Sequence, residues 1–175
     1  MGLNTEAETE KPKRVGVLFP KFFATMEEII KVKFFSRVCD SNGKEMVISV
    51  RDNELTLEQL KDNDLNQTWT LIPNLASGAN TGGYTLYHAK TSKCVIQPKE
   101  SEPIKLENGR PFGDPDFCWT LWPAGEGNSQ LLWTVQAFNA GLVMDLEQSN
   151  CKDGGRILFW KWDQSDNQRW IIKRV

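Results

Sequence analysis

The sequence reads Asn66-Gln67-Thr68-Trp69, then Asp116-Phe117-Cys118-Trp119, and finally Asn167-Gln168-Arg169-Trp170. The three tryptophans are separated by 50 residues (69 to 119) and by 51 residues (119 to 170), and a short apolar run follows each of them. A fixed period of this length indicates one supersecondary unit that is used three times. The repeat therefore predicts the fold, and the differences between its copies indicate where a functional site lies.

The bulk composition is that of an ordinary globular protein of one domain. The 175 residues are 39% hydrophobic and 25% charged, with a formal net charge of −2. This charge gives no strong field towards nucleic acids or anionic membranes, and the basic residues are scattered, so we expect no nucleic-acid partner. No apolar stretch approaches the ~20 residues of a membrane helix, so we expect no insertion into a membrane.

The N-terminus and the cysteines bear on location and on metal binding. Residues 1–10 are polar and acidic and lack the apolar segment of a secretory signal, which predicts a cytoplasmic protein, with non-classical secretion as the alternative. The four cysteines lack C-x-x-C spacing and the chain has one histidine, so we expect neither a metal site nor a cofactor. The thiols are expected to be reduced and mostly buried; in a secreted form, Cys94 and Cys118 would be the expected bridge.

Residues 1–25 are predicted to form a disordered arm and an extended strap. The first 14 residues hold too few apolar side chains to offset the entropy of ordering, and Pro20 limits the apolar run 15–23 to an edge strand or a strap. From residue 26 to residue 175 the chain reads as short strands between turn residues, which predicts one all-β domain. The expected strands include 29–35, 45–50, 55–57, 84–87, 94–96, 131–135, 142–146 and 157–162.

The three phrases of the Q-x-W type resemble those of the ricin B-type β-trefoil lectins, over about residues 27–175. The third copy matches this family most closely, with Gly141 to Leu146, Ile157 to Trp160 and Asp166 to Trp170, whereas the second copy has Phe117 in place of the glutamine. The resemblance implies an all-β fold, a β-trefoil of three repeats with pseudo-threefold symmetry, preceded by a flexible N-terminal arm. The repeats would span about 27–75, 76–125 and 126–175.

In such a fold, six strands form a barrel that three hairpins cap. Trp69, Trp119 and Trp170 would converge beneath the barrel, where each buries a large apolar area. The glutamine two positions before the tryptophan would point away from this core and satisfy main-chain groups of the turn. These residues are therefore expected to be scaffold.

The family resemblance also implies a shallow sugar pocket on each repeat that has kept its ligands. The third copy has all of them: Asp145 at the end of a Leu-x-x-Asp phrase, Trp160 seven residues before Asn167, and Asn167 with Gln168. The main chain of Leu158 would fall where the family often offers an N–H or C=O group.

These residue types suit a pyranose. The apolar face of a galactose-like ring stacks on the indole of Trp160, and its vicinal hydroxyls bind the carboxylate of Asp145 and the amide of Asn167. Gln168 is expected to brace Asp145 or the turn rather than touch the sugar. The alternative interpretation is that Asp145 is a turn residue and Trp160 is buried, although an unpaired aspartate is costly to bury inside an apolar strand.

The first two copies look degenerate. In the first, Ser49 or Val50 stands in place of the aspartate and Gln59 in place of the aromatic residue. In the second, Ile96 or Gln97 replaces the aspartate and Gly109 the aromatic residue. We expect neither copy to bind sugar in the manner of the family.

The implied function is that of a carbohydrate-binding lectin with one intact galactose- or N-acetylgalactosamine-type (GalNAc) site in the third repeat. Its partners would be glycans that carry these sugars, and a homo-oligomer would supply avidity. An enzyme is not expected, because nucleophile, phosphate-loop and zinc-protease motifs are missing from the sequence. The remaining alternative is a protein-binding β-trefoil, a protease inhibitor or adaptor, that uses the loops 51–66 and 97–117.

Overall fold

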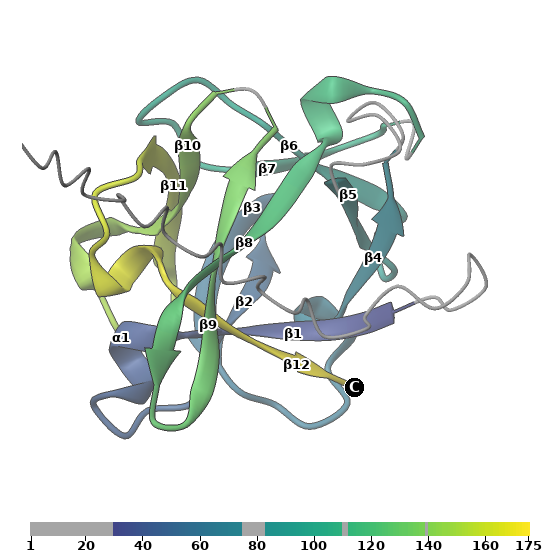
Figure 1. The fold of residues 1–175 in the computed structure, drawn as a ribbon. Helices are drawn as coiled ribbons and strands as arrows, with labels where there is room; N and C mark the ends of the chain where they lie inside the picture. Colours follow the sequence, from purple (N-terminus) through teal and green to yellow (C-terminus); the bar gives the residue numbers. More distant parts are fainter. Residues whose placement is uncertain (1–29, 75–82, 110–111, 139) are drawn as a thin grey trace, which may run out of the picture.

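The structure is a computed structural model that describes residues 30–74, 83–109, 112–138 and 140–175. The predicted arm and strap, residues 1–25, lie outside these ranges. The described residues form an all-β protein, as the sequence predicts (Figure 1). Within the same ranges, no helix has the length and apolar character needed to cross a membrane.

The strands in chain order are β1 (Ile30–Ser36), β2 (Met46–Arg51), β3 (Glu54–Gln59), β4 (Trp69–Pro73), β5 (Gly83–His88), β6 (Lys93–Ile96), β7 (Lys105–Glu107), β8 (Trp119–Gly127), β9 (Gln130–Ala137), β10 (Leu142–Leu146), β11 (Gly155–Lys161) and β12 (Trp170–Arg174). Short helical segments lie between some of them: α1 (Arg37–Asp40) and the 3-10 turns η1 (Leu65–Gln67), η3 (Pro115–Phe117), η4 (Glu147–Ser149) and η5 (Asp166–Gln168).

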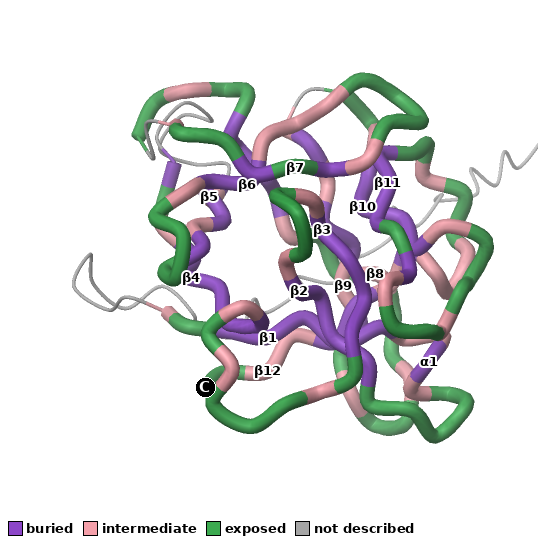
Figure 2. Tube along the Cα trace, turned by 180° about the vertical axis from the view of Figure 1, so that it is seen from behind, coloured by how far each residue is buried: buried purple, intermediate pink, exposed green. Residues whose placement is uncertain are grey.

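In the described part of the chain, six strands close into a ring. β1 pairs with β4, β4 with β5, β5 with β8, β8 with β9, β9 with β12, and β12 with β1, always antiparallel. A closed ring has no free edge, so its main-chain groups are paired without a neighbouring molecule. Figure 2 shows that most buried residues lie on the strands, whereas exposed residues lie mainly on the connecting loops and on the later part of β8.

The remaining strands form the hairpins β2–β3, β6–β7 and β10–β11. These hairpins also contact one another. β3 pairs with β11 through Gly155 and Leu57, β3 pairs with β7 through Glu54 and Lys105, and an isolated bridge joins Pro103 to Leu158. The hairpins thus form a connected cap, which positions β10 and β11 against the rest of the molecule.

The three repeated tryptophans are part of the core. Each is the first residue of a ring strand, follows a 3-10 turn and is almost completely buried. Each indole Nε1 donates a hydrogen bond to a main-chain oxygen of a hairpin strand: Trp69 to Ile48 at 3.3 Å, Trp119 to Val95 at 3.0 Å, and Trp170 to Met144 at 3.2 Å. Buried indole N–H groups need such partners. The same local arrangement therefore occurs three times, and the scaffold role of these tryptophans is confirmed.

Two short elements were not expected. β7 lies inside the stretch 97–117 that we interpreted as a loop, and α1 interrupts the stretch after β1. In β7 only Leu106 is buried between an exposed lysine and an exposed glutamate, which is too short an alternation to detect. The strand forms because the preceding strand β6 and the distant strand β3 both pair with it.

The cysteine expectations need correction. Cys39 in α1 and Cys151 before β11 form a disulfide, with Cα atoms 5.5 Å apart and a sequence separation of 112. Cys94 and Cys118 are buried thiols outside any disulfide, so the bridge expected between them is wrong, and the reduced state expected for all four thiols holds only for these two. The pairing depends on the packing of α1 against the last third of the chain, which cysteine spacing does not reveal.

Candidate functional site

The carboxylate of Asp145 lies inside β10 and is only 7% exposed. Two side-chain amides satisfy it. Asn167 Nδ2 donates to Oδ1 at 2.9 Å, and Gln168 Nε2 donates to Oδ2 at 2.8 Å. Burial of an aspartate is tolerated when its oxygens are hydrogen-bonded in this way. Asp145 is therefore a fixed acceptor within a strand, and the alternative that placed it in a turn does not hold.

Gln168 is fully buried in the 3-10 turn η5 and braces the site. Its Nε2 also donates to the main-chain oxygen of Lys161 at 2.7 Å, and its Oε1 accepts from the main-chain N–H of Asp163 at 2.9 Å. The amide thus connects β10, the end of β11 and the loop that follows. This is the bracing geometry expected from the sequence, although the two main-chain partners carry no sequence signature.

Asn167 is only partly buried and faces the same carboxylate. Both of its described hydrogen bonds leave from Nδ2, one to Asp145 and one to the main-chain oxygen of Leu146 at 3.0 Å. No described residue donates to its Oδ1, so the amide offers an acceptor to a ligand. Asp145 and Asn167 together thus present oxygen lone pairs, and this arrangement suits a ligand that donates hydrogen bonds from hydroxyl groups.

Trp160 lies on β11, and its side chain is 40% exposed. In the β10–β11 ladder Val143 is opposite Trp160, and Asp145 is opposite Leu158. Residues at these alternate positions share one face of the hairpin, and Asp145 and Trp160 are diagonal neighbours, for which about 7–8 Å is typical. The indole is therefore not packed inward, and it lies on the same face of the hairpin as the carboxylate.

Leu158 is opposite Asp145, but its main chain is largely engaged. The neighbouring Phe159 donates its N–H to Glu102 O at 3.1 Å and accepts from Ser101 N at 2.8 Å. Because main-chain groups alternate in direction along an antiparallel strand, those of Leu158 point the other way, to Asp145 in β10. Only the second lone pair of the Leu158 carbonyl is left for the predicted main-chain contact.

The surroundings of Asp145 are acidic. Burial raises the pKa of Asp145, and the carboxylates of Asp163 and Glu147 raise it further, against the lowering effect of the two amide hydrogen bonds. Glu147 is paired with Arg156 at 3.4 Å, whereas Asp163 binds the N–H and the hydroxyl of Ser165, which lowers the pKa of Asp163. The site therefore combines a desolvated carboxylate with a nearby ionised one.

The tryptophan hydrogen bonds identify the corresponding positions in the other two copies. Asp145 follows Met144, whose carbonyl accepts from Trp170; by the same criterion Ser49 follows Ile48 and Ile96 follows Val95. Ser49, and not Val50, therefore stands at the aspartate position of the first copy, and Ile96, and not Gln97, at that of the second. The hairpin registers place three residues at the aromatic position: Trp160 opposite Val143, Glu58 opposite Val47, and Glu107 opposite Cys94.

The aromatic positions inferred for the first two copies, Gln59 and Gly109, were therefore wrong. Glu58 lies eight residues before Asn66, and Glu107 lies nine residues before Asp116, whereas Trp160 lies seven before Asn167. The loop between the hairpin and the 3-10 turn differs in length among the copies, so counting a fixed seven residues misses the position.

In the first two copies the residues around these positions make other contacts. Glu58 binds Arg51 at 2.8 Å and lies 3.5 Å from Lys61 Nζ and 3.4 Å from Ser49 Oγ. In the second copy, Phe117 takes the place of Gln168 and packs so closely on Gly109 that an added Cβ would lie 2.6 Å from its ring. Neither copy pairs an aspartate with an exposed indole at the positions of Asp145 and Trp160.

Known proteins of similar structure include β-trefoils and lectins. The Macrolepiota procera ricin B-like lectin, solved in complex with lactose, is 17% identical with a TM-score of 0.61, over 83% of this chain and 95% of that one. The BEL β-trefoil in an apo crystal form is 15% identical with a TM-score of 0.62, over 87% of this chain and 100% of that one. At these identities the similarity concerns the fold alone.

A third similar structure is an exo-β-1,3-galactanase from Clostridium thermocellum. It is 19% identical with a TM-score of 0.63, over 85% of this chain but only 31% of the galactanase. No curated protein matches the sequence significantly. The sequence does match a family profile described as ricin-type beta-trefoil lectin domain-like, over residues 65–160, which is more than half of the 175 residues. The chain therefore belongs to the ricin-type β-trefoil lectin domain-like family.

Proposed function

We propose that this protein is a carbohydrate-binding lectin with one galactose- or GalNAc-type site in its third repeat, about residues 126–175. The observation that carries the proposal is the half-exposed indole of Trp160 beside the carboxylate of Asp145, whose oxygens two amides hold in place. Membership of a lectin-like family supports carbohydrate binding in general, and the lactose complex of the Macrolepiota procera lectin supports a galactoside as the first ligand to test.

The proposed binding mode follows from the acceptors of the site. The C–H face of the pyranose stacks on Trp160, and two adjacent hydroxyls donate to Asp145 and to Asn167 Oδ1. Gln168 holds the carboxylate without contacting the sugar, and the carbonyl of Leu158 accepts from a hydroxyl at the edge of the pocket. The three tryptophan units support repeats at about 27–75, 76–125 and 126–175 related by pseudo-threefold symmetry, of which only the last binds sugar.

A site of this size binds weakly. Two or three useful hydrogen bonds, less the cost of association, give a monosaccharide Kd near millimolar, or about −4 kcal/mol. Useful avidity then requires contacts with more of the glycan or several copies of the protein. We therefore propose a homo-oligomer as the form that engages cell-surface glycans.

Titration of the wild-type protein with galactose, GalNAc and lactose tests the proposal, with the NMR signal of the Trp160 indole N–H as the readout. Glucose is the control sugar, because it differs from galactose only in the configuration of the 4-hydroxyl. We expect saturable shifts with the galactosides, and their loss in Asp145→Asn but not in the control Asp116→Asn, an exposed aspartate in η3. An unchanged indole signal at tens of millimolar lactose, well above the expected Kd, would overturn the proposal.

A specific observation favours a second candidate, a non-enzymatic protein-binding β-trefoil. The stretches 51–66 and 97–117, although they contain β3 and β7, each expose a large apolar side chain, Leu65 and Phe112. Exposed apolar groups on loops suit contact with another protein. Pull-down partners lost in Leu65→Ser and Phe112→Ser, together with no signal on a glycan array, would favour this candidate over the lectin.

We propose no catalytic activity for the chain. Its single histidine, His88, is fully buried, with Nδ1 2.8 Å from Thr91 Oγ1 and its ring centroid 5.0 Å from that of Trp69. Burial also lowers the pKa of His88, which keeps the ring neutral inside the core. These features support a structural role for this histidine.

A further inference from the structure

We propose that the Cys39–Cys151 disulfide positions the 3-10 turn η5, and that reduction of this bond weakens sugar binding at the third-repeat site. The inference rests on the sugar-binding function proposed above and adds a redox dependence to it. The two cysteines lie on the two segments that flank the turn carrying Asn167 and Gln168.

The first of these segments is α1, which contains Cys39. The main-chain N–H of Arg37, the first residue of α1, donates to the carbonyl of Arg169 at 3.1 Å. Arg169 is the C-terminal cap of η5 and directly follows Gln168. Only one residue, Val38, separates Arg37 from Cys39, so the disulfide and this hydrogen bond act on the same short segment.

The second segment runs from the end of β10 to Cys151. The carbonyl of Leu146 accepts from Asn167 Nδ2 at 3.0 Å. After Leu146 the chain turns through η4, where Asn150 N donates to Glu147 O at 3.0 Å, and it reaches Cys151 one residue later. This turn includes Gln148 and Ser149 at φ values of 52° and 55°, conformations that non-glycine residues rarely adopt and that tertiary contacts must hold.

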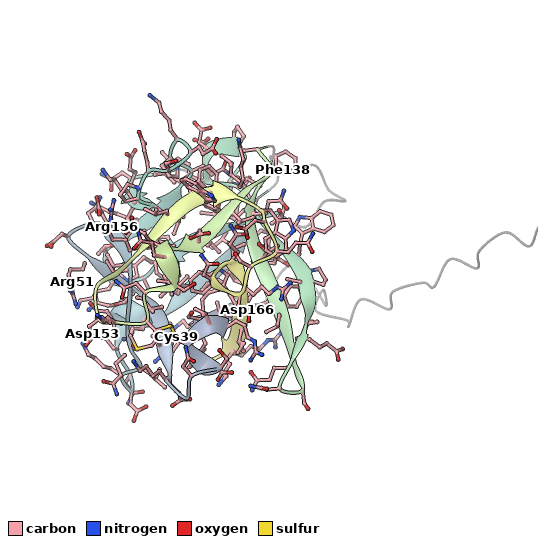
Figure 3. The ribbon with its side chains drawn as sticks, turned by 90° about the vertical axis from the view of Figure 1, so that its left-hand side faces the viewer. Cys39, Arg51, Phe138, Asp153, Arg156 and Asp166 are labelled. Atoms are coloured by element: carbon pink, nitrogen blue, oxygen red, sulfur yellow. A yellow bond between two sulfur atoms is a disulfide. The ribbon has the colours of Figure 1, made fainter. Side chains whose placement is uncertain are left out.

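A closed ring of bonds therefore surrounds the site turn. It leads from Asn167 to Leu146, through η4 to Cys151, across the disulfide to Cys39, and through Arg37 back to the end of η5. Figure 3 shows the disulfide as a yellow bond beside Cys39, with Asp153 and Asp166 labelled near it. Without the one covalent cross-link in this ring, the α1 and η4 segments hold η5 through single hydrogen bonds, beside the β1–β12 pairing that begins at Ser36 and Trp170.

The rest of the loop has anchors that do not depend on the disulfide. Gly154 N donates to Leu57 O at 2.8 Å, Asp153 Oδ1 accepts from Gln59 N at 2.8 Å, and Gly155 pairs with Leu57. These contacts keep β11 on β3 after reduction. The expected change is thus confined to α1, η4 and η5, and the barrel should stay folded.

Reduction of the Cys39–Cys151 disulfide requires a dithiol reductant such as dithiothreitol. Its thiolate attacks Cys151 Sγ, the partner that is only partly buried, and the fully buried Cys39 leaves as a thiolate. The second thiol of the reductant then resolves the mixed disulfide. Overall, the dithiol is oxidised to its cyclic disulfide, and the protein gains two electrons and two protons as two thiols.

The test compares oxidised protein, protein reduced with dithiothreitol and the variant Cys39→Ala/Cys151→Ala, all below their melting temperatures. The readouts are the lactose Kd and the NMR signals of the side-chain amides of Asn167 and Gln168. We expect reduction and the double variant to weaken lactose binding by about tenfold, through lost preorganisation, and to shift both amide signals. Dithiothreitol should have no further effect on the double variant.

Leu86→Ala is the matched control for lost stability, because Leu86 is buried in β5, outside the ring of bonds around η5. It should lower the melting temperature without moving the Asn167 and Gln168 signals. If reduction lowers the melting temperature but leaves these amide signals and the lactose Kd unchanged, the positioning role is wrong. If the oxidised protein binds no sugar, the proposed function fails, and the amide signals alone then decide the positioning role.

Discussion

Asp145 shows how a single residue links the fold to the proposed chemistry. Its carboxylate is nearly buried, and the protein compensates with the amides of Asn167 and Gln168. Burial nevertheless raises the pKa of Asp145, so at neutral pH its ionised form reduces the stability of the fold. This cost is absent below pH 3.8, the ordinary pKa, and grows as the pH rises through the raised value. Retaining such a residue fits a role in binding.

The raised pKa predicts the pH dependence of sugar binding. In the proposed binding mode the ionised carboxylate accepts the sugar hydroxyls, and protonation weakens this acceptor, so affinity should fall as the pH decreases through the pKa of Asp145. Because that pKa is above 3.8, the loss should begin at a higher pH than for an ordinary aspartate. Lactose titrations between pH 4 and pH 7 measure this. An affinity that stays constant over the range in which the Asp145 carboxyl titrates by NMR would contradict the role assigned to it.

Two exposed tryptophans, Trp160 and Trp122, serve as test and control for the proposed stacking of the sugar on an indole. Trp160 is 40% exposed beside Asp145, and Trp122 is 55% exposed on β8, with Nε1 bound to Thr120. Trp160→Ala should lower lactose affinity by at least about tenfold, since stacking on the indole is lost, while Trp122→Ala should leave it unchanged. Calorimetry or NMR titration measures both. Equal affinities of the two variants would show that Trp160 is not the platform.

The 3-10 turns that precede the repeated tryptophans are the elements on which the site is built. Gln67 and Gln168 occupy the same place in η1 and η5, and both amides join their turn to the end of a hairpin. Only Gln168 also contacts a carboxylate, Asp145. The element is therefore shared scaffold, and in the third copy it also holds the carboxylate of Asp145.

Gln168→Ala and Gln67→Ala should each destabilise the fold by about 1–3 kcal/mol for every buried main-chain group left unpaired. Only Gln168→Ala should also weaken lactose binding, because Asp145 loses one of its two donors. Thermal denaturation and sugar titration of the two variants separate the effects. A loss of binding in Gln67→Ala as well would mean that general loosening, and not the brace on Asp145, is responsible.

The predictability of the elements followed the strength of their local signals. Strands rich in β-branched and aromatic residues, such as β1 and β10, were expected from sequence, and so was the cluster of Asp145, Asn167 and Gln168. β7 was missed because it has only three residues with one buried side chain, and because one of its two partners, β3, is distant in sequence. Glu58 and Glu107 were missed because loop lengths vary between copies. The sugar-binding role of the site residues, Leu158 included, stays a prediction.

At the scale of the whole molecule, the Cys39–Cys151 bond joins the first third of the chain to the last. Linking residues 112 positions apart restricts the unfolded chain, and a loop of about this length corresponds to roughly 4–5 kcal/mol of stabilisation. This cross-link had no sequence signal, because it depends on the folded packing of α1. A persistent disulfide is favoured in an oxidising compartment. It therefore argues against the cytoplasmic location that the sequence predicts and for the alternative of secretion.

The proposed single site also determines how well the whole molecule can agglutinate cells. A monomer with one millimolar site cannot cross-link glycans, so purified monomer should agglutinate erythrocytes poorly. A tandem fusion of two copies should agglutinate them at much lower concentration. The comparison is a haemagglutination titre of both forms after size-exclusion chromatography. Strong agglutination by the monomer would indicate a second sugar site that the first two repeats were not expected to provide.

The most direct measurement is a crystal structure of the protein with lactose. We expect one galactose ring per chain, stacked on Trp160, with adjacent hydroxyls bound to Asp145 and Asn167 and no sugar at the corresponding positions near Glu58 and Glu107. Galactose bound only elsewhere on the molecule, or a Trp160 site that stays empty at saturating lactose, would contradict the central claim that this indole and this carboxylate form the sugar site.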